Sequence, residues 1–198
     1  NWSPFYHEDD PDFVLLNKLL SITELRERYL AHFRVILNNS FNTENINSLI
    51  DQYSSMIDPY VFDDPQKIYS YNEFLNSVDQ LKEYFVDRSN YLLSNNEISN
   101  SGIDILSVEY YVGNELFQSP SSADEVLISV DVESVNPIDL QLYYGNGLTG
   151  RFKKVSMDYS FATGKYTYML PPHNSGDYVR FYIETTAPNG AYVYSPEG

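Results

Sequence analysis

The chain has 198 residues, no cysteine and a formal net charge of −16, with 28 Asp and Glu against 12 Lys and Arg. This acidic balance excludes a general affinity for nucleic acid or anionic membrane surfaces, and the missing cysteines exclude disulfides, thiolate catalysis and zinc thiolate sites. No apolar run is long enough to cross a membrane, so we expect no membrane insertion. The hydrophobic content of 42% predicts a folded chain with a packed core.

Apolar residues recur every three or four positions between residues 12 and 93, which is typical of amphipathic helices. The first helix is expected over 13–20. The second is expected to begin at a capping box of Ser21 and Glu24. Because His32 falls on the apolar stripe of this helix, we expect it in the helical core rather than in a catalytic role.

Two longer helices are predicted next. One is expected to begin at Thr43 and to end at Pro59, because proline lacks the main-chain N–H that the helix needs. The other is expected to begin at a capping box of Ser70 and Glu73 and to run for about six turns, through Leu92. Together these helices predict an all-α N-terminal domain.

The pattern changes after residue 94, where the segment SNNEISNSG is polar and rich in residues that break helices. We therefore predict a helical domain over 1–95, a linker over 96–102 and a second domain over 103–198. In the second domain the apolar residues alternate with polar ones, as they do in half-buried strands. The expected strands lie near residues 105–112, 126–132, 138–144, 152–157, 166–170, 178–184 and 192–194.

Seven short strands separated by turn residues are typical of an immunoglobulin-like or fibronectin-like β-sandwich. The predicted fold class is therefore α+β in two separate domains, an N-terminal all-α helical bundle and a C-terminal β-sandwich. An antibody-type domain is not expected, because the chain has no cysteine pair and no tryptophan in the strand region.

The segment GNGLTG at residues 145–150 has the spacing of glycine-rich loops that bind phosphates. A dinucleotide-binding loop must open a helix, but the following RFKKVSMDY is expected to be a strand. A kinase glycine loop needs lysine, glutamate and aspartate partners downstream, for which the chain has no matching motifs. We therefore interpret the segment as the turn of a β-hairpin.

Asp9, Asp10 and Asp12 form the densest group of carboxylates in the sequence. Carboxylate oxygens are the ligands that Ca²⁺ and Mg²⁺ prefer, so these three residues are the candidate metal site. The alternative is that they cap the first helix, whose N-terminus favours negative charge. The spacing does not fit an EF-hand loop.

Tyr111, Tyr143, Tyr178 and Tyr182 fall on the polar phase of the expected strands. If they lie on one exposed face, they are candidates to bind a polysaccharide or a cell-surface protein by stacking. The alternative is that they form aromatic pairs between neighbouring strands.

The sequence assigns no catalytic residue and no cofactor-binding residue. Its three histidines share no metal-binding spacing, and no H-E-x-x-H or G-x-S-x-G motif is present. Hydrolase chemistry therefore has no nucleophile or base at a recognisable position.

The helical half resembles the C-terminal helical part of the CotH family, the spore-coat-H-like atypical kinases. The resemblance covers about the first 95 residues and is carried by NWSPFYHEDDPDFVLLNKLLSITELRERYLAHFRVILNNSFN, IDPYVFDDPQKIYSYNEF and LKEYFVDRSNYLL. The second half resembles the β-sandwich appended to many secreted members, through YYGNGLTGRFKKVSMDY, TGKYTYMLPP and SGDYVRFYIETTAPNGAYVYSPEG.

This resemblance implies that the parent protein is an ATP-dependent atypical kinase that uses a divalent metal. It also implies that the nucleotide-binding lysine and metal-binding aspartates lie upstream, so that Asn1 to Asp12 would enter directly from the kinase-like lobe. We therefore expect a processed or excised piece that is catalytically silent alone, with that lobe as its partner. ATP and Mg²⁺ are implied for the parent only. The resemblance further implies an extracytoplasmic, secreted location at a bacterial cell surface.

Overall fold

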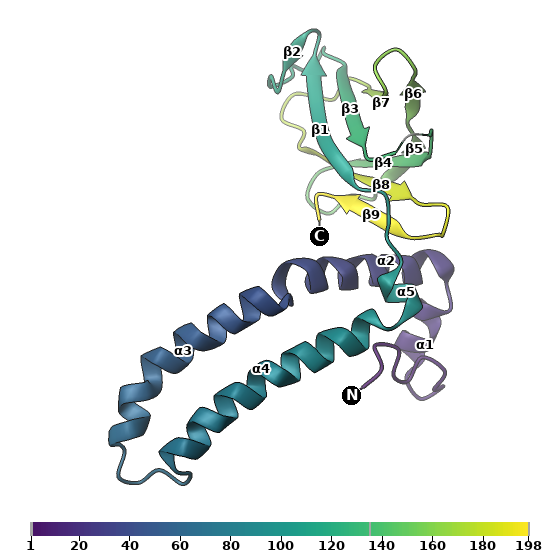
Figure 1. Ribbon diagram of the computed structural model, residues 1–198. Coiled ribbons are helices and arrows are strands. Elements are labelled where there is room, and N and C mark those ends of the chain that lie inside the picture. Colours follow the sequence, from purple (N-terminus) through teal and green to yellow (C-terminus); the bar gives the residue numbers. More distant parts are fainter. Residues whose placement is uncertain (1, 135, 198) are drawn as a thin grey trace. The chain divides into compact units, whose positions relative to one another are not determined.

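The computed structural model describes residues 2–134 and 136–197, and the chain divides into two compact units over residues 1–99 and 100–198 (Figure 1). The predicted fold class is confirmed, because helices build the first unit and two antiparallel sheets build the second. The first predicted domain begins at Asn1 and the second ends at Gly198, and these two residues lie outside the described residues.

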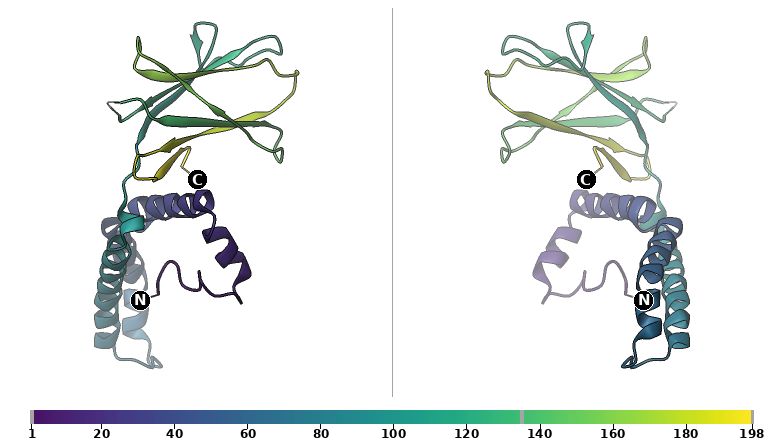
Figure 2. Two further views of the ribbon diagram at one scale, coloured as in Figure 1. Left: turned by 90° about the vertical axis from the view of Figure 1, so that its right-hand side faces the viewer. Right: turned by 90° about the vertical axis from the view of Figure 1, so that its left-hand side faces the viewer.

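The helical unit consists of short helices followed by a long helical hairpin. Its elements are α1 (Val14–Leu20), α2 (Thr23–Val35), the π-helical turn η1 (Ile36–Ser40), α3 (Thr43–Asp63), α4 (Tyr71–Leu93) and α5 (Asn96–Ser99). α5 occupies part of the segment expected as linker, and its Ile98 is buried in the helical unit. α2 joins α1 to the hairpin of α3 and α4, so that the unit forms an arch in side view (Figure 2).

Local hydrogen bonds define where the two long helices begin. The capping box of Ser70 and Glu73 is confirmed, with the Glu73 carboxylate accepting from the main-chain N–H of Ser70 at 2.6 Å. The predicted cap of α3 is off by one residue. Asn42 is the N-cap, and its side-chain oxygen accepts from the N–H of Asn45 at 2.8 Å, while Thr43 is already helical.

The predicted capping box at Ser21 is wrong. Ser21 ends α1 instead, and its hydroxyl donates to the carbonyl of Lys18 at 2.9 Å. The N-cap of α2 is Ile22, which makes no side-chain cap. The reason is that α1 and α2 follow each other so closely that the serine closes the first helix and is not available to open the second.

The predicted end of α3 at Pro59 is also wrong, because the helix continues to Asp63. Proline removes only one N–H from the helical ladder, and contacts with α4 hold the last turn. The hydroxyl of Tyr71 donates to Asp58 at 2.7 Å, and the rings of Phe62 and Tyr71 meet edge to face at 5.1 Å. Tertiary contacts therefore override the local signal.

His32 is exposed, so its predicted place in the helical core is wrong. The buried positions of α2 are Leu30 and Ala31. α2 also partly buries a charged side chain, Arg26, which pairs with carboxylates of other segments. Sequence periodicity does not predict such pairing. The small core of the unit consists of Phe5, Leu20, Leu30, Leu37, Leu92 and Ile98.

Arg26 of α2 connects three segments of the helical unit. Its guanidinium donates to Glu8 at 2.5 Å and to Glu97 of α5 at 2.6 and 2.9 Å. The same group lies over the ring of Phe5, 4.3 Å from the ring centroid. The hydrogen bonds from Arg26 lower the pKa of Glu97, so the contact between Arg26 and Glu97 joins two charged groups.

The second unit is a two-layer sandwich in which every paired strand is antiparallel. One sheet has the order β2-β1-β3-β7-β6 and the other the order β5-β4-β8-β9. The strands are β1 (Ile105–Val112), β2 (Glu115–Leu116), β3 (Val126–Val132), β4 (Asp139–Asn146), β5 (Lys153–Ser156), β6 (Asp158–Ser160), β7 (Lys165–Leu170), β8 (Val179–Thr186) and β9 (Tyr192–Ser195). When the strands are matched by their position in the chain, the first sheet contains the equivalents of immunoglobulin strands A (β1), B (β3), E (β7) and D (β6). The second sheet contains the equivalents of strands C (β4), F (β8) and G (β9).

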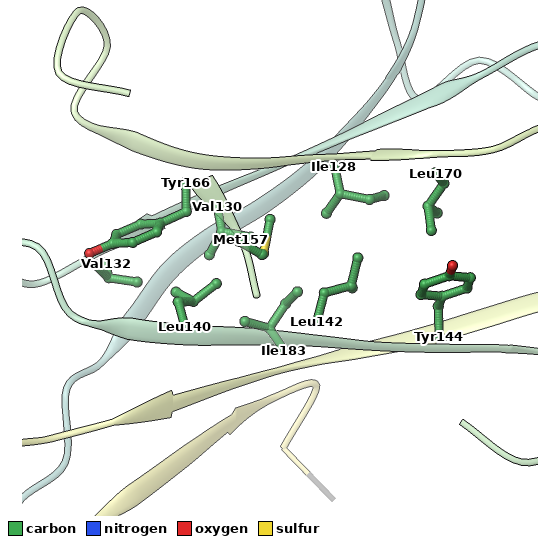
Figure 3. Packing of buried hydrophobic residues seen from close by; sticks show 10 residues of the cluster. All are labelled: Ile128, Val130, Val132, Leu140, Leu142, Tyr144, Met157, Tyr166, Leu170 and Ile183. Carbon is green, nitrogen blue, oxygen red and sulfur yellow. The ribbon is translucent and has the colours of Figure 1, made fainter. Parts of the chain in front are cut away.

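The core of the sandwich lies between the two sheets, where inward-facing side chains from both layers interdigitate (Figure 3). This arrangement follows from the alternating pattern, because every second residue of a strand points to the same face. The buried members are Ile128, Val130, Val132, Leu140, Leu142, Tyr144, Met157, Tyr166, Leu170 and Ile183.

The glycine-rich segment at 145–150 connects β4 to its antiparallel neighbour β5, as the hairpin interpretation predicts. Gly147 has a φ of +71°, and a Cβ at Gly150 would lie 2.3 Å from the carbonyl oxygen of Asn146. The turn therefore needs glycine for backbone reasons alone.

Candidate functional site

The acidic segment forms a local turn. The ring of His7 lies 2.9 Å from one oxygen of Asp10, and the other oxygen of Asp10 accepts from the N–H of Asp12 at 3.0 Å. These bonds, the one from Asp12 first, lower the pKa of Asp10. The side chains of Asp9 and Asp12 are exposed. Within residues 2–134 and 136–197, no three His, Asp or Glu side chains are grouped as metal ligands.

The alternative interpretation of this segment, a helix cap, is wrong. The N-cap of α1 is Phe13, which makes no side-chain cap, and no acidic residue lies in the first turn of the helix. The ring of Phe13 instead stacks on His7 at 3.8 Å with an interplanar angle of 12°. The three aspartates lie between His7 and Phe13 in the chain, so they belong to the turn that this stacked pair closes and precede the helix. Metal binding by Asp9, Asp10 and Asp12 stays a prediction.

Two of the four candidate tyrosines are directly paired. Tyr143 of β4 and Tyr182 of β8 are cross-strand partners, and their rings stack at 4.5 Å with an interplanar angle of 8°. The hydroxyl of Tyr143 donates to Glu184 at 3.0 Å, and the ammonium of Lys154 lies 5.4 Å from the centroid of the Tyr143 ring. Burial raises the pKa of Tyr143. The ring of Phe152 meets Tyr182 edge to face at 4.9 Å.

The other two candidate tyrosines lie elsewhere on the sandwich. Tyr111 is in β1 of the other sheet, and its hydroxyl donates to Glu109 at 2.9 Å. Tyr178 precedes β8, its side chain is exposed, and its carbonyl accepts from the N–H of Gly147. The structure thus brings Tyr143 and Tyr182 together but not the four residues. Ligand binding by any of them stays a prediction.

The helical hairpin carries an exposed apolar surface. Among the described residues of α3 none is buried, and Leu92 is the buried residue of α4. Met56 and Tyr60 are 61% and 77% exposed, and Tyr84 is 56% exposed. We define the apolar hairpin face as seven exposed side chains, Leu49, Tyr53, Met56 and Tyr60 of α3 and Leu81, Tyr84 and Tyr91 of α4.

All seven side chains lie on the same side of the hairpin. We call the line along which α3 and α4 face each other the interhelical seam. On a helical wheel with about 100° per residue, the exposed stripe of each helix lies roughly a quarter turn before the positions that face this seam. Because the two helices are antiparallel, this common offset places both stripes on one side. The ion pair of Lys82 with Asp51 and the hydrogen bond of Tyr71 with Asp58 fall on the other side of the seam.

The N-terminal segment contacts α4 beside the apolar hairpin face. Arg88 lies between Tyr84 and Tyr91 on the same stripe of α4, and its guanidinium donates to the carbonyl of Trp2 at 2.6 Å. Trp2 is 75% exposed and contacts the ring of Tyr6. The N-terminal segment therefore contacts the side of α4 that carries the apolar hairpin face.

A sequence signal for this surface exists. In α3 one apolar stripe consists of the half-buried residues Ile46, Ile50 and Val61, and a second stripe with spacings of four, three and four residues lies beside it. A helix with one neighbour needs only one stripe. The second stripe therefore indicates a second contact surface.

Comparison with known proteins identifies the helical unit. The CotH kinase protein family matches residues 3–92, and no curated protein sequence matches the chain significantly. In the described part of the chain, no helix combines the length and the apolar character that crossing a bilayer requires. The match confirms the resemblance predicted for the helical half. The region that is similar to the CotH kinase protein family, residues 3–92, lies within the helical unit.

Proposed function

We propose that the helical unit is a non-catalytic support for the kinase-like core of a CotH protein, and that this core packs on the apolar hairpin face. The observation that supports the proposal is the exposure of that face on two helices that together bury a single side chain. Contiguous apolar surface of this kind marks a site of protein contact. The occupant is the upstream part of the same polypeptide, which the family resemblance implies.

The size of the effect supports a permanent contact. Burying a large apolar side chain is worth about 1.5–3 kcal/mol, and half of that is available where the side chain is already half covered. Covering the seven side chains would therefore contribute a favourable burial free energy on the order of 5–10 kcal/mol. This is comparable to the total stability of a domain, so the covered state is strongly favoured.

The charges of the helical unit support a structural role. Phosphoryl transfer depends on cations placed against the phosphates. Here Arg26 is bound to Glu8 and Glu97, and Lys82 is bound to Asp51. These cations are neutralised by neighbouring carboxylates, so their contribution is to connect segments of the fold.

An association experiment tests this proposal. The polypeptide encoded immediately upstream is expressed as a separate chain with the present one, and the two are co-purified. We expect a stable complex that Met56→Glu with Tyr84→Glu abolishes. The matched control is Ser55→Glu with Asn72→Glu, two exposed positions on the opposite side of the hairpin. Equal loss of binding in both pairs, or no complex at all, would overturn the proposal.

The absence of catalysis by the chain alone is tested separately. Titration calorimetry with ATP and MgCl₂ is expected to give no binding heat at micromolar protein. Saturable micromolar binding of ATP would show that the nucleotide site lies within the present chain.

For the sandwich we propose a recognition role, because the stacked pair of Tyr143 and Tyr182 with its neighbour Phe152 presents aromatic rings beside Lys154. Aromatic rings of this kind stack on sugar rings or on protein side chains. On the basis of these rings we propose a cell-surface polysaccharide or protein as the ligand, and on the basis of the family resemblance we propose an extracytoplasmic location. Binding to a glycan array that Tyr143→Ala abolishes and Tyr178→Ala preserves would support the role. Equal binding by both variants would contradict it.

A further inference from the structure

The sandwich contains a cavity of about 460 Å³ at the end where β1 and β7 finish and β3 and β8 begin. Two loops close this end, residues 113–125 and residues 171–178. Its lining includes Tyr110, Asp124, Ile128, Leu170, His173, Asp177 and Phe181. Its volume lies in the range of small-molecule sites, and none of the residues assigned to a function above lines it.

The bottom of the cavity is the edge of the sandwich core. Ile128 and Leu170 point into the space between the sheets at this end of the core (Figure 3). The rings of Tyr110 and Phe181 pack against the same core and line the cavity. A ligand that enters would therefore meet an apolar floor with two aromatic side chains.

The rim is acidic and is held by two loops of the same design. In one loop, Asp124 accepts from the main-chain N–H of Ser121 at 2.8 Å. In the other, Asp177 accepts from the main-chain N–H of Asn174 at 3.1 Å. Each carboxylate uses one oxygen, Oδ2, in its turn. Both aspartates line the cavity, so these turns restrain the two carboxylates there.

The charge of the site selects the ligand. Both charged lining residues are carboxylates, and the lining residues include neither lysine nor arginine. The hydrogen bonds from Ser121 lower the pKa of Asp124, so that this carboxylate is ionised at neutral pH. The net charge of −16 adds attraction for cations at longer range.

From this arrangement we infer a binding site for a small organic cation, with its apolar body on Tyr110 and Phe181 and its ammonium group at Asp124 and Asp177. Aromatic rings and carboxylates are the two groups that stabilise an ammonium ion in proteins. The inference is independent of the proposed support function, because it concerns the sandwich alone.

Titration followed by NMR of the ¹⁵N-labelled chain tests this inference. The probes are pentan-1-amine, its neutral analogue pentan-1-ol, the anion pentanoate, and glucose as a saccharide. We expect the amine to shift amides of residues 120–126 and 173–181, and to bind at least tenfold more tightly than the alcohol or pentanoate. Equal binding of amine and alcohol, preferential binding of glucose, or shifts confined to other segments would each overturn the inference.

A pair of matched variants separates site charge from net charge. Asp124→Asn with Asp177→Asn removes both charges while the amide oxygens can still accept the turn hydrogen bonds, and it is expected to weaken amine binding about tenfold. The control, Glu133→Gln with Asp158→Asn, makes the same change in net charge at exposed positions outside the cavity. Equal weakening in both pairs contradicts the site. An unchanged pattern of remote amide shifts shows that each variant is folded.

Discussion

The sandwich and the helical unit use their apolar residues in opposite ways. In the sandwich, inward-facing residues of two sheets cover each other, and Ile128, Val130, Leu142 and Ile183 are fully buried. In the helical hairpin, residues of the same kind remain exposed on one side. The difference teaches that the sandwich contains the surfaces that its core needs, whereas the hairpin leaves apolar side chains exposed, and this exposure is the basis of the proposal that further protein covers it.

The largest expected effect comes from the sandwich core. Ile183 is fully buried in the sandwich, so Ile183→Ala should lower the free energy of unfolding by about 3–5 kcal/mol through lost contacts and a cavity. In the same chain, Leu81→Ala on the apolar hairpin face should cost less than about 1 kcal/mol, since its side chain is 45% exposed. Urea unfolding followed by far-UV circular dichroism measures both. Equal losses would contradict the comparison.

A smaller effect is expected at the ion pairs of the helical unit. Arg26→Met removes the partner of two carboxylates, Glu8 and Glu97, and should lower the free energy of unfolding by about 1–3 kcal/mol. The matched control is Lys82→Met, whose exposed pair with Asp51 should cost less than about 1 kcal/mol. The same urea experiment compares them. If Lys82→Met lowers the free energy of unfolding more than Arg26→Met does, the interpretation that Arg26 connects segments of the helical unit is wrong.

The Arg26 contacts also predict a pH dependence. The pKa of Glu97 is lowered in the folded chain, so its pairing contributes stability above the unfolded pKa of about 4.3 that is lost as the pH falls through the folded pKa. Thermal unfolding should therefore show the difference between wild type and Arg26→Met at pH 7 and a smaller difference in acid below about pH 4. A difference that stays constant from pH 7 to pH 3 would exclude an electrostatic origin.

The smallest effect is expected at the start of α4. Ser70→Ala removes one side of the capping box and should cost about 1 kcal/mol. Because α4 has little support from a core, this loss should appear as fraying of residues 70–74 in NMR chemical shifts. Ser21→Ala serves as the comparison, and since Ser21 caps no helix N-terminus, α2 should not fray.

The sequence predicted the elements of the sandwich more accurately than the helix ends of the helical unit. Seven of the nine strands found in the described residues were predictable, because one-sided burial forces alternation, as in 126–132, whereas the short strands β2 and β6 were not predicted. The ends of α2 and α3 were not, because Ser21 was used by the preceding helix and Pro59 was overruled by contacts with α4. Local patterns describe what a segment favours but not what its neighbours supply.

The candidate sites were only partly predictable. Pairing of Tyr143 with Tyr182 follows from strand register, which the sequence does not fix by itself. The exposed stripe of the hairpin has the same composition as a buried one, so periodicity alone does not show that Leu49 and Tyr53 are exposed. The cavity depends on two loops that meet only in the folded sandwich, and no motif joins Asp124 to Asp177 in the sequence.

Hydrogen–deuterium exchange of α3 and α4 tests the central claim most directly. In the chain alone, the amides of α3 and α4 should exchange much faster than those of β3 and β8, because exchange follows local burial. When the upstream polypeptide is added, the amides of both helices should become protected, with no change in β3 and β8. Protection of α3 and α4 equal to that of the sandwich strands without any partner, or exchange unchanged on addition, would contradict the account.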